Sequence, residues 1–248
     1  MSGGMYLAAA GALVQQLRLE VLANNVANIS TIGYKGDRSI FQIPEETESQ
    51  SFETSIEGIQ SLSPYAPPFS TVIDFSQGAI RQTGNPLDVA LNGSGFFSIQ
   101  TPDGVQYTRQ GNFTLDSEGV LITLDGYPVL GEGGEITLDE GTVEIDGQGG
   151  VYVDGDEVGR LQISDFTNPE TLIKAGNGRF VGSDAAILGE RPENSTVSQG
   201  YLETANVNPV RAMTEMIETS RAFEAYQKVI QSADEATSKS INDVGKTI

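Results

Sequence analysis

The sequence contains no cysteine, no histidine and no tryptophan among its 248 residues. Without cysteine and histidine the chain has no disulfides, no thiolate or imidazole metal ligands, and no nucleophile or general base of those types. These absences exclude many common enzyme mechanisms. An absence of cysteine also agrees with export into an oxidising compartment, where a free thiol is a liability.

Basic residues are scarce: 14 Lys and Arg stand against 34 Asp and Glu, a formal net charge of −20. This charge argues against binding nucleic-acid phosphates or anionic lipid as a main role. No segment approaches the roughly 20 apolar residues of a membrane span. The first basic residue, Arg18, comes too late for a secretory signal peptide. We expect a soluble chain that, if exported, uses a route without a cleaved leader.

Apolar residues recur at helical spacing from about Ser2 to Ile29, which predicts an amphipathic helix that ends near Gly33. Two neighbouring stripes give this helix a broad apolar face, and Gln15 is the polar member of the first stripe. Such a face must be covered by another element. The first stripe holds Ala12, Leu19, Leu22, Val26 and Ile29, and the second holds Leu13, Leu17 and Val21.

Helical periodicity returns in the last segment. We predict that this helix begins at Asn208-Pro209, with Asn208 as the N-cap and Pro209 in the first turn. Two terminal amphipathic helices either pair as a coiled coil or pack against neighbouring copies, and periodicity does not separate these arrangements. The predicted inner face holds Val210, Met213, Ile217, Phe223, Tyr226, Ile230 and Ala233.

Between the helices the composition changes twice. Residues 41–70 are rich in Glu, Ser, Thr, Gln and Pro, which predicts an extended linker or arm. Across residues 71–202, glycine turns separate short β-prone runs, which predicts a mostly antiparallel β domain. The expected fold is therefore α+β, with helical segments at residues 1–40 and 203–248. The expected turns are Asp103-Gly104, Glu118-Gly119, Asp125-Gly126 and Asp154-Gly155.

The segment from Leu22 to Lys35, LANNVANISTIGYK, resembles the N-terminal signature of the flagellar rod and hook protein family. Asparagine has poor helix propensity, so three in one helix need a physical reason. We expect Asn24, Asn25 and Asn28 to bond laterally to neighbouring helices and to fix their register. Further matches follow in the family's order and cover nearly the whole chain: Asn85 to Phe97, Tyr107 to Phe113, Asp125 to Gly131, Lys174 to Phe180, Thr204 to Asn208 and Arg221 to Glu224.

This resemblance implies a structural subunit of the basal-body rod, with paired, coiled-coil-like terminal helices as the inner layer of a tube and the β domain outside. It implies no enzymatic activity, cofactor or metal. The implied partners are other copies, neighbouring rod proteins and the flagellar type III export apparatus, in the periplasmic rod. A short chain without long insertions favours the proximal over the distal rod subunit. The predicted subunit interface comprises Leu19, Leu22, Asn24, Asn25, Val26, Asn28, Met213, Ile217, Phe223, Tyr226 and Ile230.

Other functions fit the same residues less well. Asn92 to Gly95 lacks the Gly-Lys-Ser/Thr of a phosphate-binding loop, and Asp146 to Glu157 lacks EF-hand spacing, so we interpret both as turns. A carboxylate-based cell-wall hydrolase requires two carboxylates in a cleft, and the chain has no tryptophan for sugar stacking. A secreted β-domain adhesin would leave the apolar terminal helices unexplained. The high negative charge has no explanation beyond solubility before assembly.

Overall fold

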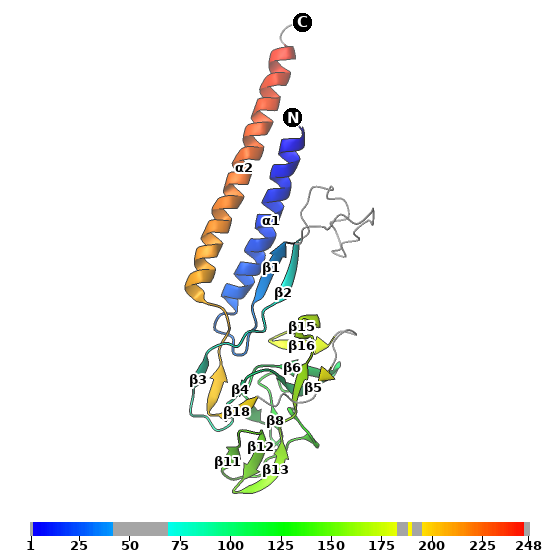
Figure 1. The fold of residues 1–248 in the computed structure, drawn as a ribbon, viewed down its shortest axis with the longest axis vertical. Coiled ribbons are helices and arrows are strands. Elements are labelled where there is room, and N and C mark those ends of the chain that lie inside the picture. Colours follow the sequence, from blue (N-terminus) through cyan, green and yellow to red (C-terminus); the bar gives the residue numbers. More distant parts are fainter. Residues whose placement is uncertain (1, 42–68, 183–187, 190–194, 246–248) are drawn as a thin grey trace. The chain divides into compact units, whose positions relative to one another are not determined.

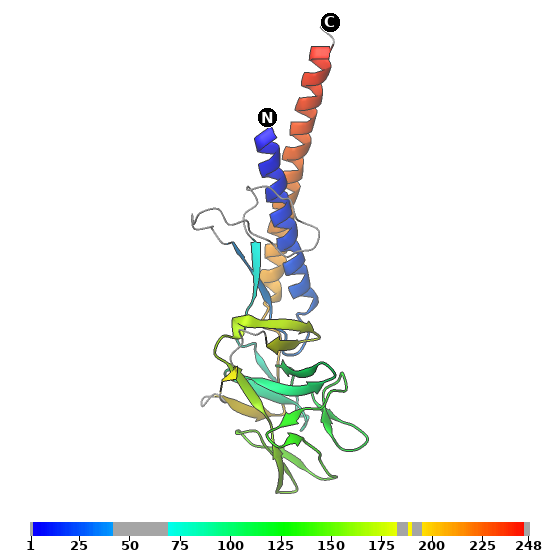
Figure 2. The ribbon, with the colours of Figure 1, turned by 90° about the vertical axis from the view of Figure 1, so that its right-hand side faces the viewer.

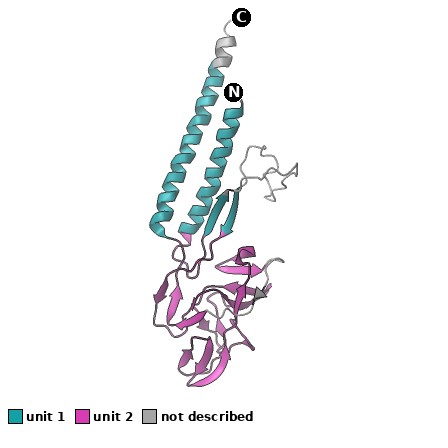
Figure 3. Ribbon diagram, viewed as in Figure 1, with its two compact units in different colours: residues 1–26, 37–72, 208–248 teal, residues 27–36, 73–207 magenta. Residues whose placement is uncertain are grey.

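The computed structural model describes residues 2–41, 69–182, 188–189 and 195–245, and it confirms the α+β fold (Figure 1). The chain divides into two compact units, which Figure 3 colours separately. Unit 1 comprises residues 1–26, 37–72 and 208–248, and unit 2 comprises residues 27–36 and 73–207. Each unit is therefore assembled from segments far apart in the sequence. Most of the predicted arm, residues 42–68, lies outside the described residues.

Unit 1 contains the two terminal helices and one small sheet. The helices are α1 (Ser2–Ala27) and α2 (Pro209–Gly245), and they run side by side in Figures 1 and 2. The sheet pairs β1 (Asp37–Phe41) with β2 (Phe69–Ile73). In the described ranges, neither helix combines the length and apolar character that crossing a membrane requires.

The start of α2 is the one that the sequence predicts. Asn208 is the N-cap: its Oδ1 accepts a hydrogen bond of 3.1 Å from the amide of Arg211. Pro209 occupies the first helical position, where its missing amide hydrogen costs nothing. By contrast, α1 ends at Ala27, before the predicted Ile29.

Unit 2 is built from short strands, and their pairings are antiparallel, as predicted. Their bounds, with one 3₁₀ turn η1 (Pro169–Thr171), are β3 (Ile80–Gln82), β4 (Val89–Asn92), β5 (Phe96–Thr101), β6 (Gly104–Thr108), β7 (Thr114–Leu115), β8 (Leu121–Ile122), β9 (Leu130–Gly131), β10 (Gly134–Glu135), β11 (Val143–Ile145), β12 (Gly150–Val153), β13 (Asp156–Arg160), β14 (Ile163–Phe166), β15 (Leu172–Gly176), β16 (Arg179–Gly182), β17 (Leu188–Gly189), β18 (Thr196–Gln199) and β19 (Tyr201–Glu203). The largest sheet has the order β15-β16-β6-β5-β14-β17, and a second has the order β11-β12-β13. The remaining pairs are β4 with β18, β3 with β19, β7 with β8 and β9 with β10.

Strand β5 lies between two apolar clusters. Phe97 and Ile99 enter the larger cluster, and Phe96 enters a smaller aromatic one with Phe180. The hydroxyl of Ser98 is buried as well and bonds the Ser164 hydroxyl at 2.9 Å. Because apolar clusters cover both faces of β5, its side chains are buried almost continuously and do not alternate between buried and exposed. The larger cluster also contains Val89, Leu91, Phe113, Leu121, Val129, Ile136, Leu138, Ile145, Val151, Val153, Leu161, Ile163 and Val197.

The predicted glycine turns are confirmed. The backbone φ angle is positive at the glycine of each one, and Asp154 also adopts a positive φ of 52° beside Gly155. Two successive residues with positive φ are what a tight two-residue hairpin between β12 and β13 requires. The glycines are Gly104, Gly119, Gly126 and Gly155.

The prediction that Gly33 stops the N-terminal helix is wrong. The helix has already ended at Ala27, and Gly33 lies in unit 2 with a φ of +64°. A Cβ atom at this position would lie 2.5 Å from the carbonyl carbon of Arg109. Glycine is therefore required here because two backbone segments of unit 2 approach closely.

Candidate functional site

The two terminal helices meet where a glycine faces an aromatic ring. A Cβ atom at Gly11 of α1 would lie 2.5 Å from Cε1 of Tyr226 in α2. Ala8 and Ala12 lie on the same side of α1, and both are buried. Small side chains thus give the tyrosine ring room between the helices. Tyr226, predicted as an interface residue, has its first partner inside its own chain.

Helix α2 carries two apolar stripes rather than the single inner face predicted from sequence. One stripe includes the contact with α1 and is buried or half-buried; it holds Ala212, Met216, Thr219, Phe223, Tyr226, Ile230 and Ala233. The second holds Val210, Met213 and Ile217, whose exposed fractions are 73%, 51% and 55%. Their spacing of three and four residues places them on one side of α2. These three residues do not join the face that contacts α1, and we call them the exposed stripe; their place in a subunit interface stays a prediction.

The predicted interface residues of α1 are mostly covered within the chain. Leu22 is buried, whereas Leu19 and Val26 are half-buried. Val14 is also buried, although it lies outside both predicted stripes. Near the beginning of α1, Tyr6 and Leu7 are exposed. Apolar surface therefore remains open at the beginning of each helix.

Asn25 makes its observed bonds to a strand of its own chain. Its side chain is buried, its Nδ2 donates to the carbonyl oxygen of Asp37 at 2.7 Å, and its Oδ1 accepts from the Asp37 amide at 2.9 Å. Asn28 accepts a bond of 3.4 Å from the Thr31 hydroxyl, while the Asn24 side chain lies on an exposed part of the helix. The Asn25 side chain thus bonds the start of β1, and the lateral bonds of the three asparagines to neighbouring helices stay a prediction.

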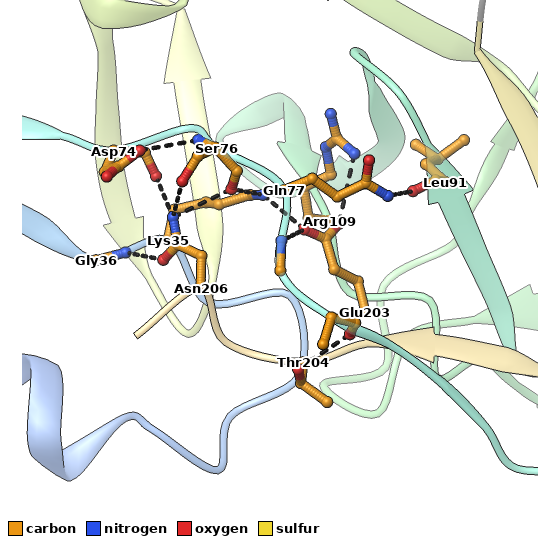
Figure 4. A network of polar contacts seen from close by, with 12 residues as sticks. Lys35, Gly36, Asp74, Ser76, Gln77, Leu91, Arg109, Glu203, Thr204 and Asn206 are labelled. Carbon is orange, nitrogen blue, oxygen red and sulfur yellow. Dashed lines mark hydrogen bonds and ion pairs between the residues drawn. The ribbon is translucent and has the colours of Figure 1, made fainter. Parts of the chain in front are cut away.

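A buried ionic network lies within unit 2 and was not predicted (Figure 4). It consists of Lys35, Arg109 and Glu203, all of which are buried. The Nζ atom of Lys35 donates to Oε1 of Glu203 at 2.7 Å and to the carbonyl oxygen of Ser76 at 2.8 Å. Arg109 donates from Nη1 to Oε2 of Glu203 at 3.4 Å. The Gly78 amide donates to Oε1 of Glu203 at 2.7 Å, so one carboxylate joins three segments.

Burial dominates the electrostatics of this buried network. It lowers the pKa of Lys35, and the neighbouring Glu203 carboxylate opposes that shift. Burial likewise lowers the pKa of Arg109, opposed by the charges of Glu203 and Asp165. The guanidinium remains charged at any physiological pH. Two cations therefore share one carboxylate away from water, and loss of that carboxylate would leave two buried cations without it.

The acidic segment that begins at Asp146 is a hairpin turn, as interpreted from sequence. Its carboxylate accepts hydrogen bonds from the amides of Gln148 and Gly150, both at 2.8 Å. The Asp146 oxygens are thus occupied by their own loop. Within the part of the chain that the structure describes, no group of three or more Asp or Glu side chains is placed to hold a metal ion.

Three family models match successive parts of the chain. The flagella basal body rod protein model matches residues 5–35, which include most of α1 and the segment up to Lys35. The flagellar hook protein FlgE/F/G D1 domain model matches residues 90–153 in unit 2. The flagellar basal body rod FlgEFG protein C-terminal model matches residues 198–243, which run from β18 into α2.

Whole-length relatives agree with these models. The chain is 35% identical to the flagellar basal-body rod protein FlgG of Agrobacterium fabrum, over 94% of this chain and 95% of the relative. It is 33% identical to FlgG of Bacillus subtilis, over 98% and 99%. It is 30% identical to the flagellar basal-body rod protein FlgF of Caulobacter vibrioides, over 99% of both chains. The chain belongs to the flagellar basal-body rod protein family, which consists of structural proteins and not of enzymes.

Proposed function

We propose that this chain is a structural subunit of the flagellar basal-body rod that polymerises through its terminal helices. The observation that carries this proposal is the exposed stripe of Val210, Met213 and Ile217 on α2. These residues lie on a side of the helix that the contact with α1 leaves open. Contiguous exposed apolar side chains on a helix are typical of protein interaction surfaces.

Burial of this stripe in an assembly supplies a moderate driving force. A large apolar side chain contributes about 1.5 to 3 kcal/mol when it is fully buried, and less when half of it is already covered. Ordering of the interacting groups opposes this gain. The proposed interface therefore favours association only when several helices pack at once. It combines the exposed stripe with the remaining open surface of Leu19, Val26, Phe223 and Ile230.

The proposed partners are other copies of this chain and neighbouring rod proteins, which the family membership supports. Leu22, Asn25 and Tyr226 enter this interface indirectly, because their observed contacts or burial lie within the chain and fix the surfaces that α1 and α2 present. We place the assembled protein in the periplasmic rod, reached through the flagellar type III export apparatus. No part of this function requires a cofactor.

Within the rod we propose the proximal segment, with the distal segment as the alternative. The alignment with FlgF of Caulobacter vibrioides spans 250 positions, close to the 248 residues of this chain. The alignment with FlgG of Bacillus subtilis spans 267 positions over 98% of the chain, which requires more insertions and deletions. The percentage identity is similar in the two comparisons, so the match in length is the observation that favours the proximal segment. Complementation of one strain that lacks the proximal subunit and of another that lacks the distal subunit distinguishes the two positions in the rod.

A charge in the exposed stripe tests the polymerisation surface. We expect Ile217→Asp to leave the secreted chain folded and to abolish its incorporation into rods, because the new carboxylate would be buried unpaired in the assembly. Leu124→Asp is the matched control, since Leu124 of unit 2 is 72% exposed. Rod content is measured by immunoblot of isolated basal bodies. Normal incorporation of Ile217→Asp would refute the proposed surface.

A further inference from the structure

The buried network joins the two flanks of unit 2. Lys35 belongs to the segment 27–36, which follows α1, and Glu203 ends β19, which precedes α2. Their side chains meet at 2.7 Å although they are 168 residues apart in sequence. Arg109, from the middle of unit 2, is the second cation that contacts the Glu203 carboxylate.

Backbone groups interlock the same flanks. The Gly33 amide donates to the carbonyl oxygen of Glu203 at 2.8 Å, and the Gly36 amide donates to Oδ1 of Asn206 at 2.8 Å. The Asp74 amide donates to the carbonyl oxygen of Gly36 at 2.8 Å. Asn206 returns a bond of 2.7 Å from Nδ2 to the carbonyl oxygen of Asp74. The segment 27–36 is therefore held between residues 74–78 and residues 203–206, as Figure 4 shows for the labelled side chains.

Several contacts are lost together if the segment 27–36 is not seated. Glu203 then loses its shortest cationic contact, although the Arg109 guanidinium at 3.4 Å and the Gly78 amide at 2.7 Å remain. The carbonyl oxygen of Glu203 and Oδ1 of Asn206 lose their bonds from the Gly33 and Gly36 amides at the same time, and buried polar groups that lose partners are costly. Partial formation of unit 2 is thus disfavoured relative to either full closure or opening.

We propose that Lys35, Glu203 and Arg109 form a closing latch that makes folding of unit 2 conditional on both of its flanks. The β strands between residues 80 and 199 do not complete a stable core until Lys35 and Glu203 are both in place. During vectorial emergence from the N-terminus, closure must then wait for residues 203–206, which come last in this unit. This inference concerns folding of the subunit and stands independently of the polymerisation surface.

Native-state amide hydrogen exchange on the full chain tests the latch. Flank reporters are the amides of Gly33 and Gly36, and core reporters are the amides of Leu121 and Val129, which bond the carbonyl oxygens of Ile136 and Leu121. We expect Lys35→Met to reduce protection of flank and core amides by the same factor, roughly tenfold to a hundredfold. Loss of protection in the flanks alone, with Leu121 and Val129 unaffected, would overturn the proposal.

Two further variants keep the test decisive. Asn206→Ala removes flank bonds and leaves all three charges of the network in place, so it is the second variant if Lys35→Met does not fold. We expect it to reduce core protection by roughly tenfold, and unchanged core protection would again contradict the latch. Arg160→Met is the matched control, because it removes a cation whose ion pair with Glu157 is solvent-exposed. It should leave both sets of amides within about twofold of the parent protein.

Discussion

One side-chain amide of α1, that of Asn25, bonds both backbone groups of Asp37, the first residue of β1. The two residues lie in unit 1, where a helix and a short strand run together. A polar side chain inside a helix is costly by propensity, but here it bonds both an amide and a carbonyl group of the strand. Asn25 therefore ties the first residue of β1 to α1.

Asn25→Ala should destabilise unit 1 by about 1 to 3 kcal/mol, because two buried hydrogen bonds to the backbone of Asp37 are lost. Urea unfolding followed by the helical circular dichroism signal measures this change. Gln16→Ala is the control, since it removes only an exposed side-chain bond to Glu20 in the same helix. Equal effects of the two substitutions would show that the bonds to Asp37 contribute little.

Gly11→Ala should destabilise the contact between α1 and α2, although alanine favours helices by about 1 kcal/mol over glycine. The new methyl group would lie 2.5 Å from the Tyr226 ring and would force the helices or the ring to move. Gly4→Ala is the matched control in the same helix, because open space surrounds that position. Thermal melts should show Gly4→Ala stabilised and Gly11→Ala destabilised.

A double variant that also removes the Tyr226 ring tests whether the clash with this ring causes the loss of stability. Gly11→Ala combined with Tyr226→Leu should recover part of the lost stability, because the added methyl group and the shortened side chain compensate each other. Additive losses in the double variant would mean that Gly11 and Tyr226 do not pack against one another.

The Asp146 hairpin should lose stability in acid. Partial burial raises the pKa of the Asp146 carboxyl, but hydrogen bonds from the Gly150 and Gln148 amides and the Tyr152 hydroxyl outweigh it and hold the pKa below its ordinary value. Since the folded pKa lies below the unfolded one, the contribution is present above about pH 4 and is lost as the pH falls through the folded pKa. Carboxyl NMR titration should therefore place Asp146 below an ordinary aspartate.

Asp146→Asn gives the corresponding stability test. The variant should be less stable than the parent protein at neutral pH, and this difference should shrink as the parent carboxylate is protonated. Urea unfolding at pH 7 and near pH 3 measures it. A difference that grows towards low pH would contradict the assignment of the carboxylate to these amides.

Local patterns in the sequence predicted the start of the C-terminal helix and the glycine turns correctly, but not the end of the N-terminal helix. Asn208 and Pro209 carry a complete helix-start signal, and an Asp-Gly pair such as Asp154-Gly155 requires positive φ almost irrespective of its surroundings. The α+β fold follows from the same short-range signals. These features depend on neighbours within a few residues, which is why one sequence reveals them.

Short-range sequence patterns did not predict which distant residues pair with each other. Lys35 and Glu203 lie far apart in sequence, and neither the spacing of Lys35 nor that of Glu203 distinguishes it from an exposed charge. The available signal was positional: Lys35 ends one family-like segment, and Glu203 directly precedes another that begins at Thr204. Likewise, periodicity identified the apolar residues of α2 but merged two stripes, because the face that contacts α1 is set by Gly11 and Tyr226.

The central claim is that the exposed stripe of α2 becomes buried in the rod. The chain contains no cysteine, so Met213→Cys introduces a single thiol at a half-exposed position of the stripe. The most direct measurement is the rate of maleimide labelling of this thiol in the free subunit and in isolated rods, with Leu124→Cys as the reference. We predict fast labelling of Cys introduced at Met213 in the free subunit and at least tenfold slower labelling in rods, roughly the protection expected from full burial. Equally fast labelling in free and assembled protein would contradict the proposed polymerisation surface.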